Sequence, residues 1–255
     1  MHVKRVTLDD LLDTYCCMQE ENVDEKWLEG LYKAREWFTV NLGKYVEGYH
    51  LCDNDKTVGL IYYAMSENAL IPYKIEKNIA CIYCTEILPN YSHKGYGRML
   101  FGFMIKDLLK ENCKGIFVAA TEFKEWMYYE HFQKQGFKEI TIKSPYRLMY
   151  FPLLQEDISV KIVDLKYKPS KDKVEVILFK NFFCPVSVYM YQMIKEIAQN
   201  LGDKVKLVEI EANPETIRKY GTADPIINGK RKFYGPSSEE EVKKAIQEEI
   251  EIFNK

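Results

Sequence analysis

The stretch Ile87-Leu-Pro-Asn-Tyr-Ser-His-Lys-Gly-Tyr-Gly-Arg-Met-Leu100 decides the fold of the first part of this chain. An apolar strand ends at its proline, a short loop carries Gly95 and Gly97, and an amphipathic helix follows at once. The first amides of a helix lack intrahelical partners and carry the positive end of its dipole. Glycines let such amides approach an anion, and Lys94 and Arg98 add positive charge. The stretch therefore predicts a site for a phosphate or pyrophosphate group.

Two other nucleotide-binding motifs compete for this loop, and neither fits its spacing. A Rossmann loop requires Gly-x-Gly-x-x-Gly near the start of its domain, whereas Gly95 and Gly97 are followed by Gly102 deep inside this one. Glu122 does end the next expected strand, where a ribose-binding acid would stand. A P-loop is excluded because no Gly-Lys-Ser/Thr follows a four-residue gap. A glycine-containing turn without any ligand is the alternative.

Apolar periodicity predicts an ordered series of elements on both sides of the loop. Turn residues between apolar runs indicate antiparallel hairpins around 53–56 and 143–145. The expected helices of this part span 8–15, 27–37, 95–111 and 122–135. The expected strands span 45–52, 57–65, 79–88 and 115–121, with a hairpin over 137–151.

The pattern restarts after Gln155 and predicts a second, smaller domain. Its expected elements are strand 173–179, helix 186–200, strand 204–211, helix 214–220, a strand and turn over 225–230, and helix 238–253. The polar, proline-containing stretch 166–172 is typical of a linker. We therefore expect a first domain over 1–155, a linker over 156–171 and a second domain over 172–255.

The composition restricts the partners of the chain. Its 255 residues carry 36 Lys and Arg against 38 Asp and Glu, a formal net charge of -2. Without a basic excess, a small molecule or a protein is a more natural partner than a nucleic acid or an acidic membrane. The opening lacks the apolar core of a signal peptide, and the longest apolar stretches are far shorter than a membrane span. We expect a soluble, cytoplasmic protein.

Residues 1–155 resemble the GNAT N-acetyltransferases, a family that binds acetyl-coenzyme A (acetyl-CoA). The family loop reads roughly Val-x-Pro-x-Tyr-[Arg/Gln]-x-x-Gly-x-[Gly/Ala]. The positions that match it are Ile87, Pro89, Tyr91, Gly95 and Gly97. Ser92 stands where Arg or Gln is usual, and Phe132 replaces the usual Tyr before the intact pair Gly136-Phe137. The resemblance implies an α/β (α+β) class, with an acyl-CoA fold built on a mixed, mostly antiparallel sheet.

The resemblance also implies the reaction and the residues that bind the cosubstrate. A neutral amine attacks the thioester of acetyl-CoA directly, and a strand amide polarises its carbonyl group. Backbone groups at Ile87 and Leu88 pair with the pantetheine arm. The pyrophosphate lies on the loop residues Ser92, His93, Lys94, Gly95, Tyr96, Gly97 and Arg98. The acceptor is a small-molecule or peptide amine.

Three residues are candidates for proton transfer. Glu86 lies in an apolar run, where burial would raise its pKa towards neutrality and suit it to act as a base. Many relatives carry this glutamate several residues earlier, and pairing of Glu86 with a nearby Lys or Arg is the alternative. Tyr128 and Tyr129 precede Phe132 by four and three residues on one expected helical face. Either hydroxyl would serve as the acid towards the sulfur, and aromatic packing is the alternative.

The cysteines point away from metal binding. Seven of them at irregular spacing, without a signal peptide, predict reduced thiols. Cys81 and Cys84 are three residues apart in an expected strand, so we expect them on opposite faces. They would then be unable to share a zinc ion or a disulfide, and we expect no metal site.

Cys184 is the one thiol placed for reactivity. It starts a helix after an apolar strand, where the helix dipole lowers a thiol pKa. The element order of residues 172–253 resembles the small α/β thioredoxin/glutaredoxin fold, in which a cis proline, here Pro225, faces that cysteine. Ser187 replaces the second cysteine of Cys-x-x-Cys, which leaves a monothiol, or a docking module with an incidental thiol. The pairing of the two domains resembles the bacterial YoaP-like acetyltransferases.

Three functions follow as hypotheses. The first is an acetyl-CoA-dependent N-acetyltransferase acting on a primary amine, with the second domain lining or covering the acceptor side. The second is a thiol-redox protein in which Cys184 carries the chemistry and the first domain senses acyl-CoA. The third is an acyl-CoA-binding regulatory protein without catalysis, suggested by Ser92 and Phe132.

Overall fold

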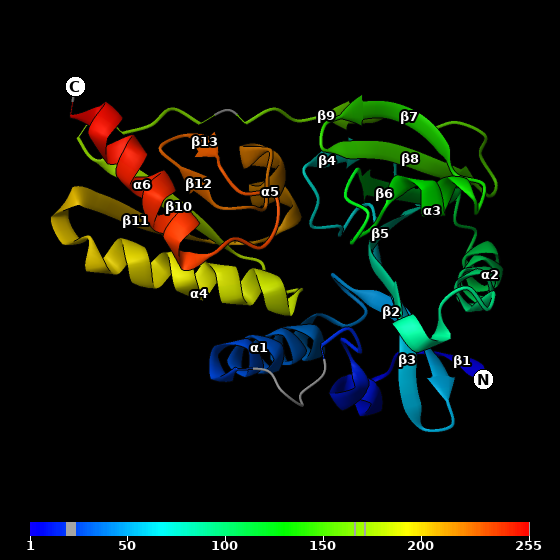
Figure 1. Ribbon diagram of the computed structural model, residues 1–255. Helices are drawn as coiled ribbons and strands as arrows, with labels where there is room; N and C mark the ends of the chain where they lie inside the picture. Colours follow the sequence, from blue (N-terminus) through cyan, green and yellow to red (C-terminus); the bar gives the residue numbers. More distant parts are fainter. Residues whose placement is uncertain (19–23, 166, 171, 255) are drawn as a thin grey trace. The chain divides into compact units, whose positions relative to one another are not determined.

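The computed structural model describes residues 1–18, 24–165, 167–170 and 172–254, and it divides into two compact units (Figure 1). The first unit takes the described residues within 1–21, 38–69 and 75–161. The second unit takes those within 22–37, 70–74 and 162–255. The domain boundaries expected at 155 and 171 stay a prediction.

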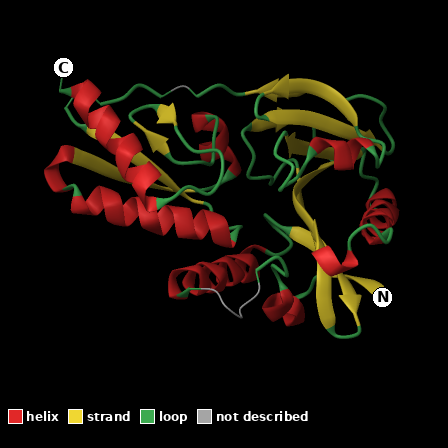
Figure 2. Ribbon diagram, viewed as in Figure 1, coloured by secondary structure: helices red, strands yellow, loops and turns green. Residues whose placement is uncertain are grey.

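One seven-stranded sheet organises the first unit (Figure 2). Its strands are β1 (His2–Arg5), β2 (Glu47–Asp53), β3 (Lys56–Met65), β5 (Ile79–Ile87), β6 (Gly115–Thr121), β7 (Lys138–Lys143) and β8 (Tyr146–Pro152). They lie in the order β1-β2-β3-β5-β6-β8-β7. All neighbours are antiparallel except β5 and β6, which run parallel. The expected mixed, mostly antiparallel sheet is confirmed.

The two faces of this sheet are covered differently. The helices α2 (Tyr96–Lys110) and α3 (Tyr129–Gln133) pack on one face, in an apolar cluster that includes Ile61, Ile82 and Phe132. Because side chains alternate along a strand, Tyr62 points to the opposite face. There its ring lies edge-on to Phe38, with ring centroids 5.0 Å apart. The sheet is therefore buried on both sides at β3.

The parallel strands β5 and β6 pair over only part of their length. Their last pair is Ile82 with Val118, yet β5 extends through 83–87 and β6 through 119–121. Beyond that pair, β5 and β6 form no backbone pairing with each other. We call this interval, lined by residues 83–87 and 119–121, the divide.

A β-bulge lies where the divide begins. Tyr63 of β3 pairs with Ile82 and Tyr62 pairs with Cys84, so Tyr83 is the extra residue of β5. A bulge bends the strand that carries it and increases its local twist. This bend is the physical reason that β5 and β6 part at this point.

One expected helix is largely wrong. Residues 122–127, expected to begin a helix over 122–135, form a loop, and α3 is limited to five residues. The amide of Thr121 donates to the Met127 carbonyl over 2.8 Å, and the Thr121 hydroxyl donates to the Trp126 carbonyl. Met127 also has a φ of +48°, outside the helical region. Bonds that close a loop thus replace the helical bonds of this segment.

Shorter 3-10 helices connect the strands of the first unit. The helix expected over 8–15 is a 3-10 turn, η1 (Leu8–Asp13), and a second turn, η2 (Pro89–Tyr91), follows β5. The amide and hydroxyl of Thr7 both donate to the carboxylate of Asp10, at 2.8 Å and 2.9 Å. This local bond favours a tight turn over a continued α-helix at η1.

The second unit is built on a four-stranded sheet. Its strands are β10 (Val174–Lys180), β11 (Val205–Glu211), β12 (Ile226–Ile227) and β13 (Lys230–Arg231), in the order β11-β10-β12-β13. β10 and β11 are parallel, and the other pairs are antiparallel. Its helices are α4 (Pro185–Asn200), η3 (Gly202–Lys204), α5 (Pro214–Tyr220) and α6 (Glu239–Phe253). This order of strands and helices agrees with the order expected from the sequence.

The helix α1 (Glu25–Asn41) belongs to the second unit as far as residue 37. Its Trp27 ring stacks on Tyr189 of α4, with centroids 4.1 Å apart and an interplanar angle of 5°. Gly30 passes so close to α4 that a Cβ there would lie 3.0 Å from the Pro185 carbonyl oxygen. A separate two-stranded sheet pairs β4 (Tyr73–Ile75) with β9 (Val160–Ile162).

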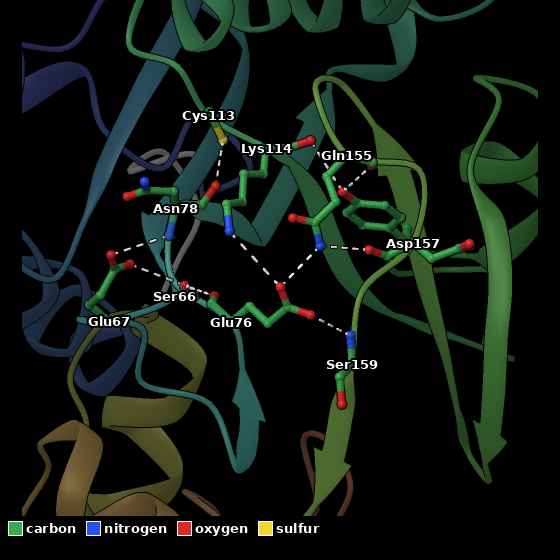
Figure 3. A network of polar contacts seen from close by, with 10 residues as sticks. Ser66, Glu67, Glu76, Asn78, Cys113, Lys114, Gln155, Asp157 and Ser159 are labelled. Atoms are coloured by element: carbon green, nitrogen blue, oxygen red, sulfur yellow. Dashed lines mark hydrogen bonds and ion pairs between the residues drawn. The ribbon is translucent and has the colours of Figure 1, made fainter.

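A polar network fastens the chain after β8 to the first unit (Figure 3). The Glu76 carboxylate accepts a hydrogen bond from the Gln155 side chain at 3.0 Å and another from the Ser159 amide at 2.9 Å. The Lys114 ammonium lies 4.0 Å from the same carboxylate. These contacts explain why the first unit extends past residue 155 to Lys161.

Candidate functional site

The loop between β5 and α2 presents backbone amides at the start of a helix. Gly95 is the N-cap residue of α2 and has a left-handed conformation, with φ +82° and ψ 0°. The Met99 amide makes the bond to the Gly95 carbonyl, at 3.1 Å. The amides of Tyr96, Gly97 and Arg98 come before it and have no helix carbonyl to reach. With the helix dipole, these three amides have the geometry and partial charge that suit an anion.

Side chains of the loop are held by local contacts. The Tyr91 hydroxyl donates to the Asp53 carboxylate at 3.0 Å, and the Lys94 ammonium donates to the Asn90 carbonyl at 2.9 Å. Lys94, His93 and Gly95 are exposed. An open hollow of about 470 Å³ lies on this side of the loop, lined by Lys56, Leu88, Pro89, Asn90, Tyr91 and Lys94. The loop before α2 is therefore open to solvent.

Ser92 turns back towards the strand that precedes it. Its hydroxyl donates to the carbonyls of Ile87 and Leu88, at 3.3 Å and 3.4 Å. The Ser92 amide donates to the Pro89 carbonyl at 3.1 Å, so both the hydroxyl and the amide of Ser92 are engaged where β5 ends.

The end of β5 directs its backbone groups to two sides. The Leu88 amide donates to the Val58 carbonyl of β3 at 2.9 Å. Because hydrogen-bonding direction alternates along an antiparallel pair, the backbone groups of Thr85 and Ile87 point away from β3, towards the divide. The structure thus corrects the expectation for Leu88, whose amide is already bound. The Ile87 amide points into the divide, where it donates to the Glu86 carboxylate.

Glu86 lies at this strand end on the face that Tyr62 also occupies, since Glu86 pairs with Leu60 in the register. It is half-buried, and burial raises the pKa of its carboxyl group. A hydrogen bond from the Ile87 amide opposes that rise. Within the residues that the structure describes, Glu86 forms no ion pair with Lys or Arg. The carboxylate therefore lies beside the divide without a neutralising cation.

Tyr128 and Tyr129 lie at the far end of β6. Tyr128 is bridged to Thr121 and has an extended backbone, with φ −63° and ψ 128°. It therefore precedes α3 and does not share a helical face with Phe132, which corrects the expectation from the sequence. Tyr129 is the first residue of α3 and packs against the same apolar cluster as Ile87.

Two charged residues that the sequence interpretation missed surround these tyrosines. The Tyr128 hydroxyl donates to the Glu130 carboxylate at 2.9 Å, and this bond raises the pKa of Tyr128 to about 12. The Arg147 guanidinium lies 4.0 Å from the centre of the Tyr129 ring. Glu130 could have been identified from the sequence, because it directly follows the two tyrosines. Arg147 lies on β8, and its position beside Tyr129 becomes apparent only from the pairing of the strands.

The bulge changes the relation between Cys81 and Cys84. Cys81 pairs with Ala64 and Cys84 with Tyr62, and these two residues of β3 share one face. The expectation of opposite faces is therefore wrong, because simple alternation fails across a bulge. Among the described residues, no group of three or more Cys, His, Asp or Glu is arranged to hold a metal ion.

The N-terminus of α4 does not activate its thiol as expected. Burial raises the pKa of Cys184, although the amides of Val186 and Ser187 donate to the sulfur and act in the opposite direction. The bond before Pro225 is trans, since the cis bond found in the described residues is that before Pro145. A cleft of about 110 Å³ nearby is lined by Ser187 and Pro225 and not by Cys184. Both expectations about this cysteine, a lowered pKa and a cis proline, are corrected.

The model of the acetyltransferase (GNAT) family matches residues 8–137, about half of the chain. No curated protein matches the chain.

Solved structures of several acetyltransferases resemble the chain over about 60% of its length. PaiA N-acetyltransferase from Thermoplasma acidophilum, in complex with coenzyme A, is 16% identical, with a TM-score of 0.41 over 60% of this chain and 100% of that one. The ribosomal-protein-S18-alanine N-acetyltransferase from Escherichia coli is 16% identical, with a TM-score of 0.43 over 61% and 95%. An aminoglycoside 6'-acetyltransferase type Ii is 14% identical, with a TM-score of 0.44 over 60% and 97%.

Proposed function

The chain belongs to the acetyltransferase (GNAT) family, and from this premise we propose that it transfers an acetyl group from acetyl-CoA to a primary amine by direct attack. The observation that carries the proposal is the divide between β5 and β6, followed at once by the free amides of α2. The edge of β5 suits the amide-bearing pantetheine arm, and the helix start suits the pyrophosphate. One ligand therefore fits both features.

The amine and acetyl-CoA together supply all the atoms, electrons and protons that the reaction needs. The amine nitrogen bonds to the acetyl carbonyl carbon, the carbon–sulfur bond breaks, and its electron pair goes to sulfur. The nitrogen loses one proton and the sulfur gains one, which leaves an amide and coenzyme A. The amides beside the divide stabilise the negative charge that develops on the carbonyl oxygen.

Glu86 is the proposed base for the amine proton, directly or through water. Its carboxyl group is half-buried beside the divide, and burial raises its pKa towards the working pH of a base. Its present hydrogen bond to the Ile87 amide is a contact that the pantetheine arm replaces on binding. The carboxylate is thereby released towards the amine.

Turnover with a panel of amines tests this function. We would incubate the full chain with acetyl-CoA and, in turn, a lysine-containing peptide, a polyamine and an aminoglycoside, and detect the acetylated amine by mass spectrometry. The expected result is steady product formation with at least one class, unchanged in Cys184→Ser. Absence of both turnover and coenzyme A binding at millimolar ligand would contradict the proposal.

A second candidate concerns the second unit alone. We propose that it has a thioredoxin-like fold that serves for docking rather than for redox chemistry. The order β11-β10-β12-β13, with α4 starting after Cys184, supports the fold. The raised pKa of Cys184 favours docking over a reactive thiol. The resemblance to YoaP-like acetyltransferases is part of the same proposal.

The partners follow from charge and site. We propose a small-molecule or peptide amine as acceptor and a cytoplasmic location. With a net charge of -2, nucleic acid is not among the proposed partners. In the part of the chain that the structure describes, no helix combines the length and the apolar character needed to cross a membrane.

A further inference from the structure

Two large aromatic residues are exposed on the loop that follows β6. Phe123 and Trp126 are 41% and 45% exposed. Neither belongs to the apolar cluster beneath α2 and α3, and within the described part of the chain neither ring contacts another ring. Burial of such side chains is favourable, so their exposure together on one short loop indicates a surface that a ligand covers. We call these two residues the aromatic pair.

Thr121 holds the backbone of this loop in place. Its amide donates to the Met127 carbonyl at 2.8 Å, and its hydroxyl donates to the Trp126 carbonyl. The Phe123 amide donates to the same hydroxyl at 3.3 Å, and Thr121 is itself fully buried. A loop that is already ordered loses little freedom when a ligand binds, so the aromatic pair is carried on a preorganised backbone.

The position of this loop relative to the start of α2 follows from the sheet. β5 and β6 run parallel, so both strands end at the same edge. At that edge β5 continues into the loop before α2, and β6 continues into residues 122–127. Thr121, which closes the second loop, also lines the divide. The loop of the aromatic pair therefore lies at the edge where a pantetheine arm in the divide would meet its pyrophosphate.

The charges of the loop favour a neutral ring over a charged group. Lys124 and Glu125 carry opposite charges, and the Glu122 carboxylate lies 3.3 Å from the guanidinium of Arg147. These four groups have no net charge with which to recognise a cation or a further phosphate. The flat faces of Phe and Trp instead suit a heteroaromatic base, because stacking requires no charge. Coenzyme A carries one such ring, the adenine beyond its pyrophosphate.

We propose that the aromatic pair stacks on the adenine ring of the bound cosubstrate and thereby makes the chain selective for coenzyme A over a phosphopantetheine arm that lacks the nucleotide. The inference rests on the proposed function and names a determinant of its acyl donor. Stacking orders the adenosine end and takes no part in the acetyl transfer. A donor that presents 4′-phosphopantetheine on a carrier protein would lack this contact and would bind more weakly.

Affinities for coenzyme A and for 4′-phosphopantetheine, measured by calorimetry on the full chain, test this without any acceptor. Trp126→Ala should weaken coenzyme A binding by about tenfold, the size of one base–aromatic stack, and should leave 4′-phosphopantetheine binding within about twofold. Phe123→Ala should act in the same direction by at least about threefold. Trp126→Phe keeps a stacking ring and should bind coenzyme A within about threefold of the unmodified chain.

Three controls separate stacking from folding. Trp126 holds the loop through its carbonyl group, which alanine also supplies, so Trp126→Ala should melt close to the unmodified chain. Tyr32→Ala removes another exposed aromatic ring, on α1 in the second unit, and should leave both affinities within about twofold. The chain has three tryptophans, and the change in their emission on adding coenzyme A should disappear in Trp126→Phe.

Each outcome decides the role of one residue. Coenzyme A affinity that is unchanged in Trp126→Ala, or an equal loss for both ligands, would overturn the role of Trp126. Unchanged coenzyme A affinity in Phe123→Ala would overturn the role of Phe123. In these cases coenzyme A still binds the unmodified chain. If it does not bind, the proposed function fails as well, so the two failures are distinguishable.

Discussion

The amide of Leu88 donates to the carbonyl of Val58 over 2.9 Å, and this bond determines which way the end of β5 faces. It leaves the backbone groups of Ile87 directed into the divide. We predict that acetyl-CoA slows hydrogen exchange at the Ile87 amide, because the pantetheine arm takes over that donor. The Leu88 amide should be equally slow with and without ligand. Exchange measured by NMR checks this, and unchanged exchange at Ile87 with ligand bound would contradict it.

Replacing Glu86 by Gln should remove a titrating base. Burial raises the pKa of this carboxyl group, so activity should rise with pH as Glu86 loses its proton. Glu86→Gln should lower kcat/KM on the order of a hundredfold and flatten that rise. Coenzyme A affinity should change little. A pH profile of kcat/KM for both proteins is the measurement, and an unchanged profile would assign the base elsewhere.

His50 makes the first unit sensitive to mild acid. It is fully buried on β2, with Nε2 2.9 Å from the Tyr62 hydroxyl, and burial lowers its pKa to about 4. Near it, Asp10 raises this pKa and Lys4 lowers it. The unfolded chain takes up a proton near pH 6.5, before the folded chain does, so the His50 contribution is complete above pH 6.5 and is lost as the pH falls towards 4.

The size of this effect is measurable. The difference between the two pKa values corresponds to about 3 kcal/mol of unfolding free energy between pH 6.5 and 4. Urea unfolding of the full chain at several pH values should show this fall. In His50→Gln, which cannot take up a proton, the fall over the same interval should be smaller by that amount. An equal fall in the free energy of unfolding for the two proteins over this pH interval would contradict the prediction.

Cys184 should react slowly with alkylating reagents. Burial raises the pKa of its thiol, so little thiolate is present near neutral pH. Cys17 is exposed and serves as an internal comparison in the same sample. Mass spectrometry of iodoacetamide labelling against pH measures both sites. A Cys184 that titrates below the ordinary cysteine value of about 8.5 would restore the redox hypothesis.

Elements with strong local signals could be predicted from the sequence. The strand 115–121 and the helix 214–220 have the bounds expected for them. In the second, Pro214 starts the helix, Asn213 caps it and Gly221 ends it in a left-handed conformation, all within reach of neighbouring residues. The turn from β5 into α2 was predictable for the same reason, because its glycines and the helix after it are contiguous in the sequence.

Features that depend on distant residues could not be predicted. The bulge at Tyr83 exists only in the register with β3, and it places Cys81 and Cys84 on one face. Arg147 reaches Tyr129 from a different strand, and no spacing in the sequence indicates that contact. The loop 122–127 replaces a helix because Thr121 bonds to residues beyond it. In the first two cases a tertiary contact overrides a local preference, and in the third a contact that closes a loop does so.

Binding of coenzyme A to Gly97→Glu tests most directly that the start of α2 holds the pyrophosphate. A Cβ at Gly97 would meet only Ile87, at 3.8 Å, so the variant should fold, while its carboxylate would oppose the pyrophosphate. Gly102→Glu adds the same charge on the same helix in open space. By calorimetry we predict that Gly97→Glu weakens coenzyme A binding by more than about tenfold and that Gly102→Glu leaves it within about twofold. Equal affinity of the Gly97→Glu and Gly102→Glu variants would contradict this assignment.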